Sequence, residues 1–208
     1  MGTETQTTVL SPYAVLAREH RLIERALNVL GRICDEIRRT KKLDASAATQ
    51  VIHFLRDFAD GTHHLKEERV LFPAIDAKAF FPGCGLISEH ELGRKRVRSM
   101  AEAVERSSRG DAEAAKVFMR YARSYINLLR AHIAKEDECL ANVVAATFSG
   151  DERERLTQAL EEMERREIGE RAFERFAAIV EVLEARFGGG SSTDPNAEVS
   201  IQSRPETN

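Results

Sequence analysis

The spacing of its prolines is the feature that most limits how this 208-residue chain can fold. The five prolines lie at positions 12, 73, 82, 195 and 205, so residues 13–72 and 83–194 contain none. Both runs are rich in Ala, Leu, Glu and Arg, which favour helix, whereas a proline inside a helix removes a hydrogen bond and kinks the backbone. We therefore predict an all-α fold.

Apolar residues recur every three or four positions along four segments, as they do on the buried face of an amphipathic helix. We predict four helices, which cover residues 12–40, 45–76, 86–108 and, after a cap at Asp111, a segment that extends through Val143. The stretch from Phe80 to Gly85 contains a proline and two glycines, so we expect a loop there. The short connections favour an up-down-up-down four-helix bundle.

A further helical segment follows the bundle. We expect Asp151 to cap it, Gly169 to interrupt it and Phe187 to end it. Its phenylalanine-rich stripe must pack against the bundle or against a second copy of the chain, so a homodimer through this segment is one expected arrangement. The predicted organisation is a flexible N-terminus (1–10), a bundle (11–148), a C-terminal amphipathic helical segment (150–187) and a disordered tail (188–208).

Composition excludes several functional classes. The formal net charge of −3 provides no broad basic surface for nucleic acid, and no run of eighteen apolar residues is present to span a membrane. The first residues lack the basic and apolar parts of a signal peptide, so we expect a cytoplasmic protein. Cys34, Cys84 and Cys139 are far apart and odd in number, which argues against a disulfide framework and a thiolate metal site.

Four histidines occupy positions where the apolar stripes call for core residues, one on each predicted helix: His20, His63, His90 and His132. Glu67 and Glu136 each follow one of these histidines by four residues, which places both side chains of each pair on one helix face. With a rise of about 1.5 Å per residue, His20, Glu67, His90 and His132 each lie roughly 27–31 Å from the turn of their hairpin. The two hairpins therefore bring them to one level.

A metal site explains this set better than ordinary core packing does. Each histidine alone would fit a satisfied core position, but burying four imidazoles and two carboxylates together is costly without a cation. Imidazole and carboxylate ligands without thiolates suit iron, manganese or zinc, and six side chains exceed the needs of one tetrahedral zinc. We therefore predict two metal ions that share carboxylate bridges, with iron as the favoured metal and manganese or zinc as substitutes.

Four segments carry a resemblance to a known family: HRLIERAL, FADGTHHLKEERVLFPAI, EHELGRKRV and LLRAHIAKEDECL. They resemble the hemerythrin-like, or HHE cation-binding, domain over roughly residues 12–145. The resemblance implies a four-helix bundle that holds two irons bridged by carboxylates and an oxygen species. Carried over by position, the bridges would be Glu67 and Glu136, and the terminal ligands would be the four histidines named above.

The chain departs from the oxygen-carrying members of that family in two places. They use a second histidine four residues after the third-helix ligand, where this chain has Arg94. They also place an aspartate five residues after the fourth-helix histidine. Asp137 has that spacing here, but on an α-helix it points about 140° away from His132, so we prefer Glu136. The missing histidine favours reaction with peroxide, O2 or nitric oxide over simple O2 carriage.

Two adjacent histidines compete for one ligand position, because His64 has the same spacing to Glu68 that His63 has to Glu67. On an α-helix, His63 lies within about 20° of the apolar stripe. His64 falls on the polar face, so we expect it to be solvated. The roles of some neighbours stay open: Glu24 or Glu91 could supply the ligand missing at Arg94, Tyr125 fits the core better than a proton donor, and Cys139 fits as a small apolar residue.

These inferences give one leading hypothesis and one runner-up. The leading hypothesis is a cytoplasmic non-haem di-iron protein that binds or reacts with a small oxidant (O2, hydrogen peroxide or NO), with no nucleic-acid or membrane partner. If it is an enzyme, it is an oxidoreductase that acts on one of these molecules. The runner-up is an iron, oxygen or redox sensor, or an iron-handling protein, in which metal occupancy controls a partner interaction.

Overall fold

A computed structural model describes residues 11–78 and 84–188, and its regular elements in those ranges are all helical. The predicted all-α class is therefore confirmed. The predicted flexible N-terminus, most of the expected 80–85 loop and nearly all of the expected tail lie outside the described residues.

Helix α1 (Pro12–Thr40) has the termini that the sequence predicts. The Ser11 side chain accepts a hydrogen bond from the Ala14 backbone N–H at 3.1 Å, and Pro12 occupies the first turn, where its missing N–H has no consequence. At the other end, Lys41 adopts a left-handed conformation (φ 59°) and donates its N–H to the Ile37 carbonyl at 2.8 Å. The helix therefore begins and ends for local reasons.

The second predicted helix has the expected limits but not a uniform α period. It consists of α2 (Ala45–Phe54), η1 (Leu55–His64), η2 (Glu67–Leu71) and α3 (Phe72–Asp76). The two η segments are π-helical, with wider turns closed by i→i+5 hydrogen bonds. This change of period alters which side chains face the bundle interior.

Helices α4 (Cys84–Ser108) and α5 (Ala114–Thr147) form the second hairpin. Helix α4 begins two residues before the predicted Leu86, so Cys84 and Gly85 belong to the helix and not to a loop. Asp111 is not the N-cap residue of α5; its carboxylate instead accepts the Glu113 N–H at 2.9 Å, in the turn before the helix.

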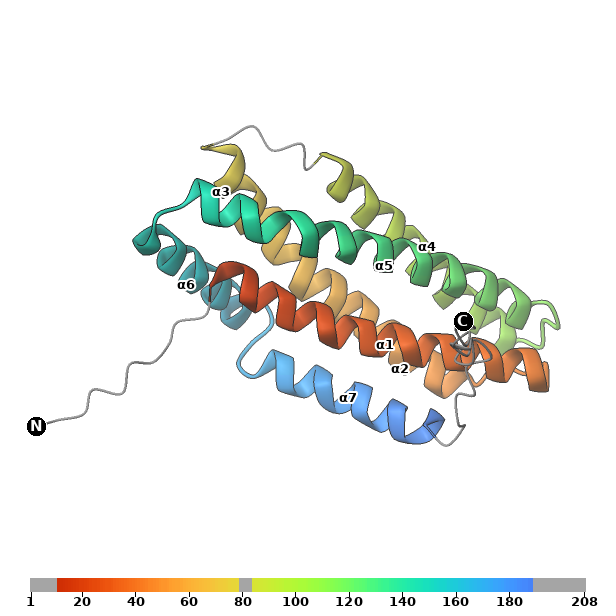
Figure 1. Ribbon diagram of the computed structural model, residues 1–208. Coiled ribbons are helices and arrows are strands. Elements are labelled where there is room, and N and C mark those ends of the chain that lie inside the picture. Colours follow the sequence, from red (N-terminus) through yellow and green to blue (C-terminus); the bar gives the residue numbers. More distant parts are fainter. Residues whose placement is uncertain (1–10, 79–83, 189–208) are drawn as a thin grey trace, which may run out of the picture.

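Four helical rods make up the bundle (Figure 1): α1, the rod formed by α2 to α3, α4 and α5. Going around the bundle, α1 packs against α5, α5 against α4, α4 against α2, and α2 against α1. Their facing sides form the apolar core, in which residues such as Leu27, Phe54, Met100 and Phe118 are fully buried. Within the described ranges, this is the predicted four-helix arrangement.

Two further helices cover the outside of the bundle. Helix α6 (Gly150–Glu167) is capped by Ser149, which forms a reciprocal capping box with Glu152, so the predicted cap at Asp151 is wrong. Gly169 (φ 96°) lies in the break between α6 and the next helix, which is the interruption that the sequence predicts. Helix α7 (Ala172–Phe187) then runs along α1 and α2 (Figure 1).

The phenylalanine stripe of α7 is covered by the bundle of the same chain. The Phe176 ring packs against Phe54 and Phe58, with centroid separations of 6.1 and 5.3 Å. Helix α6 packs against α1 and η2, closer to one end of the bundle. Both helices are therefore in contact with elements that carry the predicted ligands.

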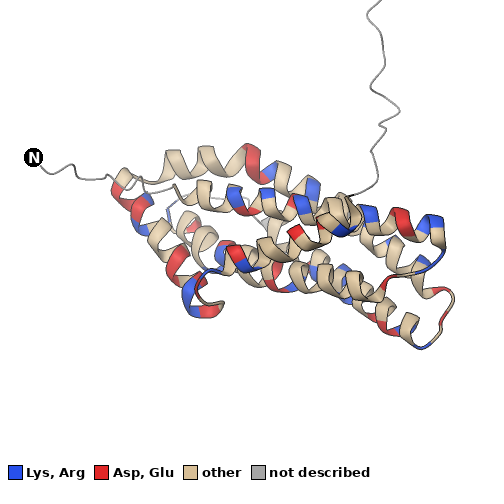
Figure 2. Cartoon of the chain, turned by 90° about the horizontal axis from the view of Figure 1, so that it is seen from below, with Lys and Arg blue, Asp and Glu red and all other residues tan. Residues whose placement is uncertain are grey.

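The outer surface carries both signs of charge. Figure 2 shows Lys and Arg interspersed with Asp and Glu over the helices, without one large area of a single sign. Among the described residues, no helix has both the length and the apolar character needed to cross a membrane.

Candidate metal centre

The six predicted ligands meet inside the bundle. They come from α1 (His20), η1 (His63), η2 (Glu67), α4 (His90) and α5 (His132 and Glu136), and each is at most 1% exposed. Every rod of the bundle therefore contributes at least one of them. The fold therefore brings these side chains to one level along the bundle axis, as the sequence predicts.

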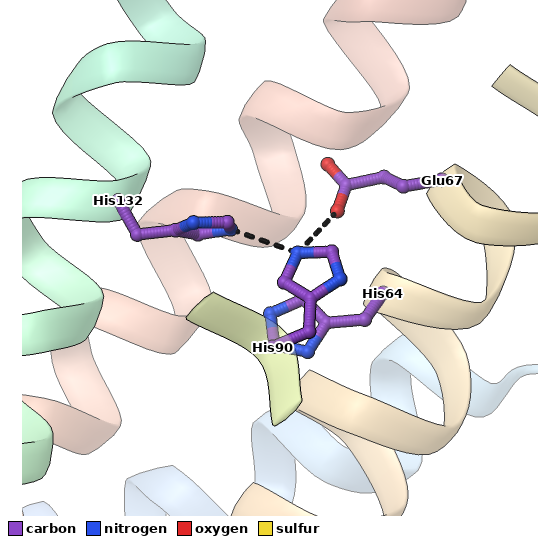
Figure 3. Close-up of side chains that lie close together, drawn as sticks. All are labelled: His64, Glu67, His90 and His132. Carbon is purple, nitrogen blue, oxygen red and sulfur yellow. Dashed lines mark hydrogen bonds and ion pairs between the residues drawn. The ribbon is translucent and has the colours of Figure 1, made fainter. Parts of the chain in front are cut away.

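Their ligand atoms form two groups. The three-histidine cluster consists of His64, Glu67, His90 and His132, and the two-histidine cluster consists of His20, His63, Glu67 and Glu136. Within each cluster the candidate ligand atoms all lie within 4.8 Å of one another. Figure 3 shows the three-histidine cluster, in which His90 Nε2 faces His132 Nε2 at 3.0 Å and a Glu67 oxygen at 3.5 Å.

The two glutamates span both clusters. Glu67 places Oε1 3.5 Å from His63 Nε2 and Oε2 3.5 Å from His90 Nε2. Glu136 places Oε2 3.2 Å from His20 Nε2 and Oε1 3.1 Å from His132 Nε2. Each carboxylate thus presents one oxygen to each cluster, which is the arrangement that a carboxylate bridge between two cations needs.

The outward-facing nitrogen of every cluster histidine meets a carboxylate. The Nδ1-to-oxygen distances are 2.7 Å from His20 to Asp137, 3.0 Å from His63 to Glu19, 3.4 Å from His64 to Asp60, 2.7 Å from His90 to Glu68 and 2.9 Å from His132 to Glu89. An ionised carboxylate only accepts, so an imidazole that faces one donates from Nδ1. In all five histidines Nε2 is the nitrogen left to face the cluster interior. Metal-binding histidines are held in this way.

Most of the outer carboxylates, which are the five that face the Nδ1 atoms, are kept ionised by their neighbours. Burial alone would raise their pKa values, but hydrogen bonds from the imidazoles and from nearby donors lower the pKa of four of them: Asp60, Glu68, Glu89 and Asp137. Glu19 is the exception, because its deeper burial raises its pKa against the opposing charge of Lys66.

The inner groups divide into two kinds. Burial lowers the pKa of His63 and His64 well below the usual value, so both are neutral and have a lone pair at Nε2. Burial, and then the charge of Glu136, raises the pKa of Glu67 well above its usual value. Burial also opposes ionisation of Glu136, but the nearby imidazoles of His132 and His20 hold its pKa well below the usual value.

Several inner atoms have no hydrogen-bond partner. These buried atoms are Nε2 of His20, His63 and His64 and both carboxylate oxygens of Glu67 and Glu136. An unsatisfied buried polar atom costs about 1–3 kcal/mol, and more if the group is charged. Seven such atoms around two centres are explained by cations that the side chains coordinate, and imidazole nitrogen with carboxylate oxygen is a suitable donor set for iron, manganese or zinc. The residues present therefore fit a metal pair.

His64 was predicted to be solvated, and this is wrong: it is 2% exposed and belongs to the three-histidine cluster. The physical reason is η1, whose π turns shift the helical phase between Leu55 and His64. A phase angle calculated for an α-helix from Ile52 therefore does not apply at this position. Its imidazole is the fifth histidine of the two clusters.

Glu24 and Glu91, the two carboxylates that could have replaced the ligand missing at Arg94, lie outside both clusters. Glu24 pairs with Arg21, and Glu91 is more than half exposed and pairs with Arg94. Arg94 itself donates to Asp60 and Glu68 at 2.8 Å. It therefore holds the two carboxylates that orient His64 and His90.

Three further predictions have clear outcomes. Asp137 faces His20 Nδ1 and not the cluster interior, so the preference for Glu136 agrees with the geometry. Tyr125 is a core residue, 1% exposed. Cys139 is exposed, and the prediction that it packs as an apolar residue is wrong because Leu140, one turn after Glu136, takes the inward position.

Sequence reasoning missed two buried charges next to the centre. Glu19 is 2% exposed and Lys66 is 1% exposed, and the lysine donates to both Glu19 and Glu164 of α6. No local signal identifies them, because a charged residue on an amphipathic helix is normally solvated. Their partners come from elements far away in the sequence.

Comparison with known proteins places the bundle in a family. The family model described as "Hemerythrin HHE cation binding domain" matches residues 11–144. The chain is also 21% identical over 187 residues to uncharacterised proteins of Mycobacterium bovis and Mycobacterium tuberculosis, covering 89% of this chain and 73% of each relative. No solved structure matches the chain.

Proposed function

Because the chain belongs to the hemerythrin HHE cation-binding domain family, we propose that its two clusters hold a pair of iron ions that binds or reacts with a small oxidant. The oxidants are O2, hydrogen peroxide and NO. Manganese or zinc can occupy the same donor set; zinc has no redox chemistry, whereas iron provides the electron transfer that these molecules require. We also propose a cytoplasmic location, where such a protein would meet them.

The ligand set follows from the two clusters. His64, His90 and His132 would hold one metal, His20 and His63 the other, and Glu67 and Glu136 would bridge them. The observation that supports this most strongly is the pairing of all five Nδ1 atoms with carboxylates, which directs all five Nε2 atoms to the interior. A structural core would not need this common orientation.

The protein's own residues prepare the centre for a small ligand. When bound, an iron pair supplies electrons and an open coordination position. The two-histidine cluster has one imidazole fewer, so the small molecule is placed there. Asp137 and Glu19 hold its two imidazoles in position, and the near-complete burial of His20 and His63 excludes bulk water. With His64 in the set, reversible O2 binding is as well supported as reaction with peroxide or NO.

Anaerobic titration with Fe(II) tests this proposal. We expect about two irons per chain, and near-ultraviolet absorption of an oxidised iron pair after exposure to O2 or peroxide. His132→Ala and Glu67→Ala should each strip metal, whereas His53→Ala, which removes an exposed histidine from the same rod as Glu67, should leave the iron content unchanged. A chain that stays metal-free, or full occupancy in both ligand variants, would contradict the proposal.

Turnover decides whether the protein is an enzyme. Peroxide added to the iron-loaded protein should release oxygen over many cycles if it is an oxidoreductase. A single oxidation event without further release favours a carrier or a sensor.

A second candidate function, a metal sensor, is favoured by one chain of contacts. His63 Nδ1 lies 3.0 Å from Glu19 Oε2, Glu19 accepts from Lys66, and Lys66 also donates to Glu164 of α6. This series of contacts joins the two-histidine cluster to a helix outside the bundle. A cation on His63 would strengthen its Nδ1–H bond to Glu19, so metal loading would stabilise the position of α6.

Hydrogen exchange over α6 tests the sensor candidate. Iron loading should slow exchange in α6 of the unaltered protein and of Glu162→Ala, whose carboxylate pairs with Arg165 of the same helix. Glu164→Ala should lose most of this effect. Equal exchange in α6 with and without metal would remove the sensor candidate and leave the oxidant-binding proposal intact.

A further inference from the structure

A cavity of about 330 Å³ lies between the second helical rod and α4, and its lining includes one residue of the three-histidine cluster. That residue is His64. The cavity also reaches the buried ring of Tyr125 on α5. The oxidant-binding proposal does not use this space.

The cavity is too large for the small oxidants alone. One water molecule takes up roughly 30 Å³ in the liquid, so the space equals the volume of about ten water molecules. Pockets for organic ligands begin at about 300 Å³. The volume therefore fits a small organic molecule.

The walls are mainly apolar. Ile52 and Leu55 line one side, and Val97 and Ala101 line the other. From Gly93 to Ala101 the lining follows α4 for eight residues, or about 12 Å at the rise of an α-helix. An alkyl chain matches this elongated apolar space.

Three of the four charged side chains in the lining are arginines: Arg56, Arg94 and Arg98. Arg94 is occupied by Asp60, Glu68 and Glu91, and Arg56 is occupied by Asp57. Arg98 also lines the cavity and is exposed, and no ion pair or hydrogen bond of its guanidinium is described within residues 11–78 and 84–188. A guanidinium at the mouth complements a carboxylate.

Gly93 keeps the cavity open. It lies in the interior of α4, where glycine weakens a helix. A Cβ atom built at this position would meet only the Tyr125 ring, at 3.4 Å. A larger side chain would therefore extend into the cavity without a clash with backbone.

From these observations we propose that the cavity binds a medium-chain monocarboxylate, with its alkyl chain between the second rod and α4 and its carboxylate beside Arg98. The alkyl chain lies against His64, so an organic ligand and the metal centre share one residue. This site does not depend on which metal the clusters hold, so it can fail or stand independently of the proposed function.

Calorimetric titration of the full-length protein with straight-chain carboxylates and with primary alcohols of matched length tests the site. Affinity should rise about fourfold for each added methylene until the cavity is filled. Each carboxylate should bind more tightly than the matched alcohol. Arg98→Gln should remove that preference and leave the alcohol affinity unchanged. Weak binding that does not depend on chain length would overturn the proposal.

Variants that fill the cavity provide a second test of the proposed site. Gly93→Leu should weaken binding of both ligand series at least tenfold, whereas Gly31→Leu, at a glycine of α1 with open space around its Cβ position, should not. Ala101→Phe fills the cavity from the opposite end and serves if Gly93→Leu does not fold. Unchanged binding in a folded cavity-filling variant, or an unchanged carboxylate preference in Arg98→Gln, would refute the assignment.

Discussion

Lys66→Met removes the cation from a buried ion-pair network next to the centre. The Lys66 ammonium is 1% exposed and donates to Glu19 and Glu164. Burial would lower the pKa of this lysine, but the charges of Glu19 and Glu164 outweigh burial and raise it, so Lys66 is charged at neutral pH. Without it, Glu19 remains buried between His63 and an apolar methionine.

The expected loss of stability is large for a single side chain. Removing one partner of a buried ion pair costs about 3–5 kcal/mol, because the other charge stays buried. For a chain of this length each kcal/mol shifts the melting temperature by roughly 2–4 °C, so the variant should melt about 6–20 °C lower. Glu164 adds little to the loss because its side chain is 20% exposed and can be hydrated.

Urea unfolding of the metal-free protein measures this difference, and two companion variants interpret it. Glu19→Gln/Lys66→Met removes both charges and keeps an acceptor for His63, so it should recover a large part of the loss. Lys78→Met breaks the pair with Glu152, in which both side chains are more than a third exposed, and should leave the free energy of unfolding almost unchanged. If Lys66→Met also leaves the free energy of unfolding almost unchanged, the Lys66 ammonium is not the charge that stabilises buried Glu19.

Three further predictions concern the centre and α6. Metal loading near neutral pH should release protons, because Glu67 and His132 have raised pKa values in the metal-free protein and a cation displaces their protons. Metal affinity should therefore rise with pH. Calorimetry in buffers of different ionisation enthalpy measures the protons released, and a count of zero would contradict this prediction. His64→Ala should weaken iron binding at least tenfold, because even the loss of a residue that only orients a metal ligand costs about 10-fold or more in affinity. Equal iron affinity in His64→Ala and His53→Ala would remove His64 from the ligand set. Ser149→Ala should cost about 1 kcal/mol and increase exchange in the first turn of α6, and unchanged exchange there would show that the capping box contributes nothing.

The fold was predictable because several independent signals agree. Long proline-free runs, 3-4 apolar spacing and short connections all indicate a bundle, and the ends of α1 follow from Ser11 and Lys41. Helix ends with competing caps were less predictable. At α6, both Ser149 and Asp151 are good N-cap residues, and only the reciprocal bond to Glu152 decides between them.

The meeting of six side chains was predictable from spacing and helical rise, but the seventh member was not. His64 was missed because the angle between residues was calculated for an α-helix, and the π turns of η1 change that angle. The outer carboxylates and Lys66 were missed for a different reason: their burial depends on partners from other helices, which a helical wheel does not contain. The predicted domain limits and the homodimer stay predictions.

Anomalous diffraction from crystals loaded with Fe(II) under anaerobic conditions tests the central claim most directly. We expect two iron peaks per chain, one within bonding distance of His64, His90 and His132 and one within bonding distance of His20 and His63, with Glu67 and Glu136 between them. A single peak, or peaks bound by other residues, would contradict the proposed metal pair.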